Sequence, residues 1–285
     1  MLTPTPPLRG GPPPGWYPDP WRESSYRWWD GTQWTAAIHP QAAQLAPPQY
    51  YYAPIPKPAH VSPTFSPRAA FGILAATFAS ILLATFVGEH VDFLADWMAV
   101  VVVYVVLFGA MYGSVLLFSR TLGTGSVRKD FGLAIKAEDI GWGALAFAGT
   151  MVGRIVLAIF LSNIDDDPVR DVGDSLDLKG AVLFAFAVAA LVGAPIVEEL
   201  VFRGVVQRGF TKLAGAPLAI GLQAVLFSAY HFVPDGSGYS HFYFGALVVF
   251  GIGAGIAVDR TGRLGPGIVA HAINNAVAIT VLALS

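Results

Sequence analysis

From residue 69 onward, the chain is a series of apolar stretches that are close to the length of a membrane span. A transmembrane helix needs about 20 residues to cross about 30 Å of hydrocarbon. Seven stretches fit this description, of which the fifth is short: residues 70–88, 97–119, 139–162, 180–205, 216–233, 241–258 and 265–284. Only 13% of the 285 residues are charged, against about 25% in soluble domains. The sequence therefore predicts an all-α polytopic membrane protein with a bundle of about seven transmembrane helices in the lipid bilayer.

Positive charges orient these spans, because Lys and Arg concentrate in cytoplasmic loops. Cations flank one side of the predicted spans, at Arg68, Arg120, Arg128, Lys129, Arg208, Lys212, Arg260 and Arg263. The opposite loops carry Glu89, Asp92, Asp96 and Asp165–Asp167 and few cations. The pattern predicts a multi-pass protein of the plasma membrane with a cytoplasmic N-terminus.

Three different segments precede the spans. Residues 1–14 are rich in Pro and Gly and are expected to be disordered, whereas residues 15–38 hold five of the seven tryptophans. Asp30-Gly31 is a hairpin turn signal between two aromatic-rich runs, so residues 15–38 are predicted to form a very small β unit. Residues 39–68 are a Pro-rich linker of extended character. Residues 69–285 form the predicted transmembrane domain.

The Trp-rich unit has a recognisable pattern. Gly15-Trp16-Tyr17-Pro18-Asp19-Pro20-Trp21, followed by Tyr26–Thr35, resembles the short module catalogued as DUF2510. That module precedes membrane segments in many actinobacterial proteins, and its function is unknown. The resemblance leaves two interpretations open: a small anchor or spacer, and a peptide-binding module comparable to WW domains with a cytoplasmic partner.

Two adjacent acids, Glu198 and Glu199, lie inside the fourth apolar stretch. A charge in hydrocarbon costs at least about 2.5–3.5 kcal/mol on insertion scales, so such residues are usually functional. His231 and His271 lie in later apolar stretches. This combination suggests proton chemistry in or beside the bilayer. The chain has no cysteine and no basic tract, which excludes a thiolate nucleophile and argues against nucleic-acid binding.

A helical hairpin brings some of these residues together. Residues 213–217 form a plausible turn, and Glu198 precedes its centre by about as many residues as His231 follows it. At about 1.5 Å of rise per residue, both side chains are expected at the same depth. Arg203 follows Glu199 by four residues, which is the spacing of an intrahelical ion pair. Pro195 lacks an N–H and favours a kink or a widened turn just before the acids.

The chemistry of these groups leaves two mechanisms open. A carboxylate and an imidazole that share one water can make it a nucleophile, and an imidazole with an amide can stabilise an oxyanion. His271 and Asn275, four residues apart on one helical face, suit the second task. Alternatively, Glu198, His231 and His271 could bind a divalent metal such as zinc.

Three motifs in this region resemble those of the CPBP family (CAAX protease and bacteriocin-processing, or Abi) of intramembrane endopeptidases. They are Glu198-Glu199-x-x-x-Arg203, Phe227-x-x-x-His231 and His271-x-x-x-Asn275, and the resemblance covers about residues 130–285. It implies a helical membrane bundle, with Glu198 as the general base, His231 as its partner on the water, and His271 with Asn275 as oxyanion stabilisers. Glu199, Arg203 and Phe227 would support them.

The leading prediction is therefore an intramembrane endopeptidase that cuts a membrane-associated peptide or protein. The metal-free mechanism is preferred because Asn is a poor zinc ligand and Glu198 already has a partner on the water. The alternative is a non-catalytic membrane scaffold or immunity-type protein that binds a peptide in the same place. A proton-coupled transporter ranks last, because the sequence shows no inverted repeat.

Overall fold

The computed structural model describes residues 12–21, 26–39, 67–161, 179–231 and 241–284. They form two compact units, one before and one after the Pro-rich linker. Residues 1–11 and 40–66 lie outside the described residues, so the expectations of a disordered tail and an extended linker stay predictions over those ranges.

The N-terminal unit is a three-stranded antiparallel sheet with the order β1-β2-β3. Its strands are β1 (Gly15–Pro18), β2 (Tyr26–Trp29) and β3 (Trp34–His39). The predicted hairpin turn is confirmed: Asp30 Oδ1 accepts hydrogen bonds of 2.7 Å from the backbone N–H groups of Thr32 and Gln33, and Gly31 has a φ of 99°. The backbone bond from Gln33, together with those from Thr32, holds the pKa of Asp30 below its ordinary value.

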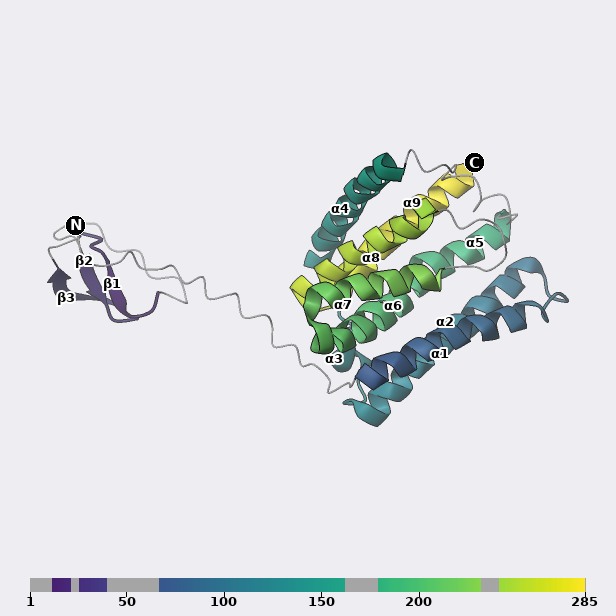
Figure 1. Cartoon of the computed structure of the whole chain (residues 1–285), viewed down its shortest axis with the longest axis horizontal. Coiled ribbons are helices and arrows are strands. Elements are labelled where there is room, and N and C mark those ends of the chain that lie inside the picture. Colours follow the sequence, from purple (N-terminus) through teal and green to yellow (C-terminus); the bar gives the residue numbers. More distant parts are fainter. Residues whose placement is uncertain (1–11, 22–25, 40–66, 162–178, 232–240, 285) are drawn as a thin grey trace. The chain divides into compact units, whose positions relative to one another are not determined.

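The described residues of the membrane unit are almost entirely helical (Figure 1). Five segments are long and apolar enough to span a bilayer: residues 69–88, 96–122, 138–161, 180–230 and 241–261. The corresponding helices are α1 (Pro67–Gly88), α2 (Asp96–Leu122), α4 (Glu138–Leu161), the long segment from Gly180 to Tyr230, and α8 (His241–Thr261), with the short α3 (Val127–Phe131) and α9 (Gly265–Leu284) completing the set. The chain is therefore a multi-pass membrane protein, as the sequence predicts.

The long segment contains both the fourth and the fifth predicted spans. It consists of α5 (Gly180–Val188), the π-helical η1 (Ala189–Gly193), α6 (Ala194–Glu199), the π-helical η2 (Leu200–Gln207) and α7 (Arg208–Tyr230). Gly215 interrupts α7 with a φ of 79° and a ψ of 164°, a conformation that glycine adopts without a Cβ penalty. The chain reverses there, so the seven predicted stretches correspond to the five spans, with the long one counted twice, and α9.

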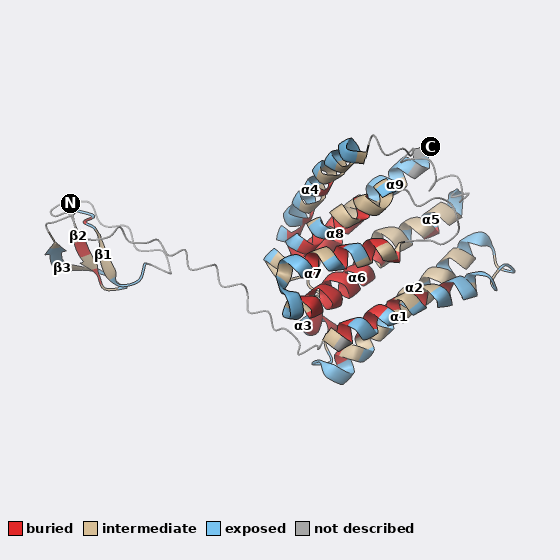
Figure 2. Cartoon of the chain, in the orientation of Figure 1, coloured by how far each residue is buried: buried red, intermediate tan, exposed pale blue. Residues whose placement is uncertain are grey.

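Small residues let the helices approach closely, as is common in membrane bundles. Helix α4 packs against α8 and α9, and α7 packs against α8. A Cβ added at Gly143 of α4 would lie 2.5 Å from Val269 Cγ1 of α9, and one at Gly251 of α8 would lie 2.7 Å from Ala224 Cβ of α7. Exposed residues lie mostly on the outward faces of the helices, whereas buried residues concentrate around α6 (Figure 2).

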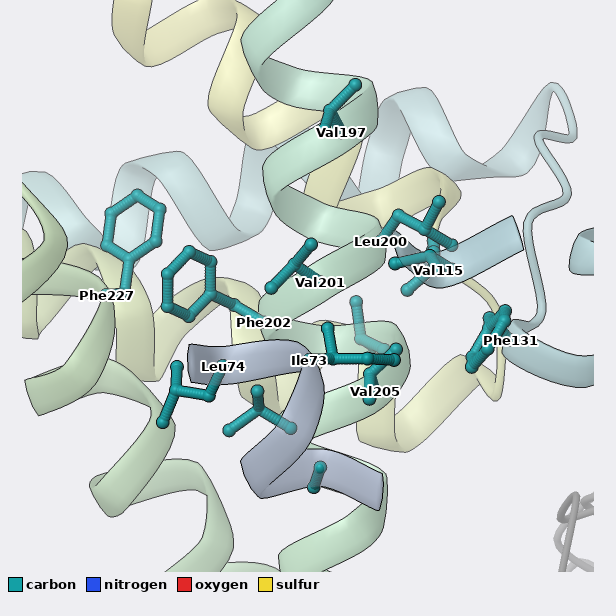
Figure 3. Close-up of a cluster of buried hydrophobic side chains, with 14 of the residues drawn as sticks. Ile73, Leu74, Val115, Phe131, Val197, Leu200, Val201, Phe202, Val205 and Phe227 are labelled. Carbon is teal, nitrogen blue, oxygen red and sulfur yellow. The ribbon is translucent and has the colours of Figure 1, made fainter. Parts of the chain in front are cut away.

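The core is centred on α6 and η2. Figure 3 shows this cluster, in which side chains from α1, α2, α3 and α7 meet those of the central segment. The labelled members are Ile73, Leu74, Val115, Phe131, Val197, Leu200, Val201, Phe202, Val205 and Phe227. All eight residues of η2 are buried. The acid pair at the end of α6 is thus held in the middle of the bundle.

Candidate active site

The helix widens immediately before the acid pair. Segment η1 is a π-helix, and in it the Ala194 N–H bonds the Ala189 carbonyl five residues earlier. The next residue, Pro195, has no N–H to give to the Ala190 carbonyl. The amide of Asn275 donates to that carbonyl instead, at 2.8 Å. The predicted widened turn is confirmed, and the hydrogen bond from Asn275 connects α9 to it.

Glu198 and His231 lie at the same level of the hairpin, as the sequence predicts. Glu198 Oε2 lies 3.6 Å from His231 Nε2, and the Glu198 residue is 4% exposed. His231 Nδ1 lies 2.8 Å from the Phe227 carbonyl oxygen. Because a carbonyl can only accept, Nδ1 carries the proton and Nε2 of the neutral ring is an acceptor. Two acceptors therefore face each other, and among the described residues Glu198 Oε2 has no hydrogen-bond donor.

His271 contacts both acids. Its Nε2 lies 3.8 Å from Glu198 Oε2, and its Nδ1 lies 3.3 Å from Glu199 Oε1. A carboxylate oxygen accepts, so Nδ1 is the donor of this contact. His271 belongs to α9, and its ring is buried. The second acid thus orients the second imidazole, a contact that spacing along the chain did not reveal.

Glu199 forms the predicted ion pair with Arg203, at 2.8 Å between Oε1 and Nη1, and both side chains are fully buried. The guanidinium carbon also lies 4.5 Å from the centre of the Phe227 ring and 5.4 Å from that of Phe250. Such cation–π contacts help a cation that has lost its water. Phe250 is a contact that the sequence analysis missed.

Phe227 is a packing residue of the site. Its ring centre lies 4.6 Å from that of His231 and 5.7 Å from that of His271. Together with its carbonyl bond to His231 Nδ1, this ring limits the rotamers of both histidines. A positioning role for Phe227 stays a prediction.

Asn275, four residues after His271 on α9, makes two hydrogen bonds of its own. Its side-chain N–H group goes to Ala190, and its carbonyl oxygen accepts from Asn274 Nδ2 at 3.2 Å. An amide nitrogen has two hydrogens, so one N–H remains for another acceptor. Asn275 is therefore both a brace for η1 and a candidate donor.

A mostly apolar pocket of about 440 Å³ lies among residues of α3, α6, α9 and the segment after α3, and none of the seven motif residues is among its lining residues. Its walls include Ile196, two residues before Glu198, and Ile268, three residues before His271. The remaining lining comes from Arg128, Leu133, Ala134 and Ile135, in and after α3. A cavity of this size can hold an apolar side chain or a short hydrocarbon segment.

The donor set of the zinc alternative was tested against this geometry. Glu198, His231 and His271 are near one another, but in the described part of the chain no three His, Asp or Glu groups are arranged to hold a metal ion. His271 has the carboxylate partner that metal-bound histidines commonly have, a feature that a catalytic histidine shares.

Comparisons with known proteins give two family matches, one of which covers the range that holds these residues. Residues 180–277 match the family described as type II CAAX prenyl endopeptidase Rce1-like, and this range includes all seven residues of the three motifs. Residues 14–47 match DUF2510, a protein family of unknown function. No curated protein matches the chain, and no solved structure does. Both resemblances are confirmed: residues 180–277 carry the signature of the Rce1-like CAAX endopeptidases, which supports an intramembrane CAAX protease kind of function, and residues 14–47 carry that of DUF2510.

Proposed function

We propose that this protein is an intramembrane endopeptidase in which Glu198 and His231 activate a water to hydrolyse a peptide bond. The observation that carries the proposal is the pair of facing acceptors, Glu198 Oε2 and His231 Nε2, 3.6 Å apart inside the bundle. A water between them can donate one hydrogen to each. Such a water has its oxygen lone pairs free to attack a carbonyl carbon.

The reaction then follows from the positions of the groups. Glu198 takes a proton from the water. At the same time the water oxygen bonds to the carbonyl carbon, and the carbonyl oxygen becomes an oxyanion. When the C–N bond breaks, Glu198 returns the proton to the leaving amine. The products are a carboxylic acid and an amine, so Glu198 ends as it began.

The oxyanion would be stabilised by His271 and Asn275. Asn275 keeps one N–H after bonding Ala190. His271 already donates through Nδ1 to Glu199, so donation through Nε2 requires the doubly protonated ring, whose charge the Glu199 carboxylate balances. Preorganised donors of this kind are typically worth about 10²–10³-fold in kcat each.

The substrate that fits this setting is a membrane-associated peptide or protein. Its scissile bond would reach the acid pair from the bilayer. We place the protein in the plasma membrane with a cytoplasmic N-terminus, because Lys and Arg concentrate on one side of the spans.

A cleavage assay in lipid nanodiscs tests the proposal. The wild-type protein is expected to cut members of a fluorogenic peptide library, and Glu198→Gln to lose at least about 10³-fold in kcat, as general-base and positioning effects combine. Glu89→Gln, at an exposed loop acid, is the matched control and should retain full activity. Thermal unfolding of both variants separates loss of chemistry from loss of fold. Normal turnover by folded Glu198→Gln would refute the mechanism.

A further inference from the structure

The N-terminal sheet contacts a proline segment of its own chain. The Trp29 indole Nε1–H donates to the Pro12 carbonyl at 2.9 Å, and the Tyr17 hydroxyl donates to the Pro13 carbonyl at 2.8 Å. The next residue, Pro14, lies over the hairpin turn, where a Cβ added at Gly31 would be 3.2 Å from Pro14 Cγ. Two aromatic hydrogen-bond donors and one glycine thus contact three consecutive prolines.

Prolines suit this kind of site for a physical reason. Proline has no N–H, so it cannot pair as a central strand. It favours the extended polyproline II conformation, in which the carbonyls point outward and stay available as acceptors. Aromatic-lined grooves recognise such segments at a small entropic cost, because the segment is already extended.

The donors on the sheet are held in place before any peptide binds. Trp29 is 5% exposed, and its ring packs edge-to-face against Trp34 at a centroid distance of 5.3 Å. The Tyr17 ring also meets Trp34 edge-to-face, at 6.2 Å. Preorganised donors lose little freedom on binding. Pro12, Pro13 and Pro14, in contrast, are exposed. This proline segment is therefore the part that a ligand can displace.

We propose that Tyr17, Trp29 and Gly31 form a binding site for a proline-rich peptide of a partner protein. In the free chain Pro12–Pro14 occupies this site, and the partner displaces it. The sheet is then a recognition module whose own N-terminal segment competes with the ligand. This inference does not depend on the proposed protease activity.

Binding is tested on the full-length protein in nanodiscs with fluorescein-labelled decaproline, by fluorescence anisotropy. Saturable binding is expected. Tyr17→Phe removes one donor and should weaken binding about two- to tenfold, the usual range for one neutral hydrogen bond. Tyr26→Phe is the matched control: Tyr17 pairs with Arg27, so Tyr26 lies on the opposite face of the sheet by strand alternation and its loss should leave binding unchanged. Equal binding of a Gly/Ser decapeptide would overturn the proposal.

Displacement has a readout of its own. In protein labelled at the indole nitrogens, the Trp29 Nε1–H resonance is assigned with Trp29→Phe and followed during the titration. It should shift as decaproline replaces Pro12–Pro14. A variant with serine at positions 12–14 should bind decaproline more tightly than the wild type, because the competing segment is lost.

Two further results would contradict the proposal. If neither the wild type nor the serine variant binds decaproline while the indole resonances stay dispersed, Pro12–Pro14 is a fixed brace. If decaproline binds only after Pro47 and Pro48 are also replaced by serine, the linker of this chain is the occupant and the assignment to a partner is wrong. If the serine variant loses its dispersed indole resonances, its sheet is no longer folded. The wild-type titration with decaproline alone then tests the proposal.

Discussion

His271 Nδ1 lies 3.3 Å from Glu199 Oε1, so the second acid of the pair holds a histidine whose other nitrogen faces the first acid. Glu199 also binds the buried guanidinium of Arg203. The two adjacent carboxylates therefore have different surroundings: Glu198 faces two imidazole nitrogens, whereas Glu199 is shared between a cation and a ring. This difference underlies the separate roles that we propose for them.

Glu199→Gln should destabilise the protein more than Glu198→Gln does. It leaves the Arg203 charge buried without its partner, and breaking a buried pair in this way typically costs about 3–5 kcal/mol. Chemical or thermal unfolding in detergent micelles measures the difference. The double variant Glu199→Gln/Arg203→Met should recover part of the loss, because both charges are gone. Equal stability of the two single glutamine variants would argue against a structural role for Glu199.

Asn275→Ala should lower both stability and kcat. It removes the partly buried hydrogen bond to the Ala190 carbonyl, worth about 0.5–1.5 kcal/mol, and it removes a proposed oxyanion donor, worth about 10²-fold or more in kcat. Thr280→Ala, at an exposed position of the same helix, is the comparison variant and should keep kcat within a few-fold. Steady-state kinetics with unfolding curves measure both effects. A fall in stability with unchanged kcat would show that Asn275 is a brace only.

Gly267→Ala should reduce activity without touching a catalytic atom. A methyl group there would collide with Glu199 Oε2, so the carboxylate that contacts His271 must shift. Overpacking of this kind typically costs about 1–3 kcal/mol. Gly141→Ala is the control, because a Cβ there meets nothing within 4 Å among the described residues and alanine favours a helix by up to about 1 kcal/mol. Kinetics and unfolding of the pair give the test, and equal behaviour would contradict the close contact.

Asp130 should make stability depend on pH outside the membrane. Burial acts to raise the pKa of Asp130, but hydrogen bonds from Ser119 and Thr124 outweigh it and the pKa is lowered. Its contribution is therefore complete above the unfolded-state pKa of about 3.9 and is lost as the pH falls through the lower folded-state value. Asp130→Asn should cost about 2 kcal/mol at neutral pH, with the difference from the wild type shrinking below about pH 4. Unfolding temperatures across this range are the measurement, and a difference that does not change with pH would contradict it.

Chelation should leave the activity intact. In the proposed mechanism the water is activated by Glu198 and His231 alone. Purified protein treated with EDTA and shown by mass spectrometry to lack bound metal is therefore expected to cleave at the wild-type rate. Loss of cleavage that returns with added zinc would favour the metal alternative.

The sequence was sufficient where distance along the chain fixes geometry. The turn at Gly215 placed Glu198 opposite His231, and the four-residue spacing placed Arg203 on Glu199, because helix rise and pitch are nearly constant. The Asp30-Gly31 hairpin followed from the need for a positive φ. These predictions rest on local rules, and the structure confirms each contact.

The sequence was insufficient where helices meet. The spacing of the motifs does not show whether His271 Nδ1 contacts Glu199 or Glu198. That choice depends on how α9 is rotated about its axis, which the packing around Gly267 influences. The partner of Arg154, a cation inside α4, is likewise set by packing, because its Nε donates to the Ala246 carbonyl of α8 at 3.4 Å. Such contacts depend on how the surfaces of two helices fit together, and the hydrophobic periodicity of the sequence does not determine this.

The π-helical segment η2 has a consequence for insertions and deletions. It separates the acid pair from the hairpin turn at Gly215. In an α-helix each residue adds about 100° of rotation, so the number of residues between the acids and the turn sets the direction in which Glu198 points. A π-helix is an α-helix that has absorbed an extra residue in a turn. Removing one residue from η2 would restore ordinary pitch while every motif residue remained in the chain, yet it would turn the carboxylates away from the histidines. The phase of this helix is therefore as much a part of the site as the residues themselves.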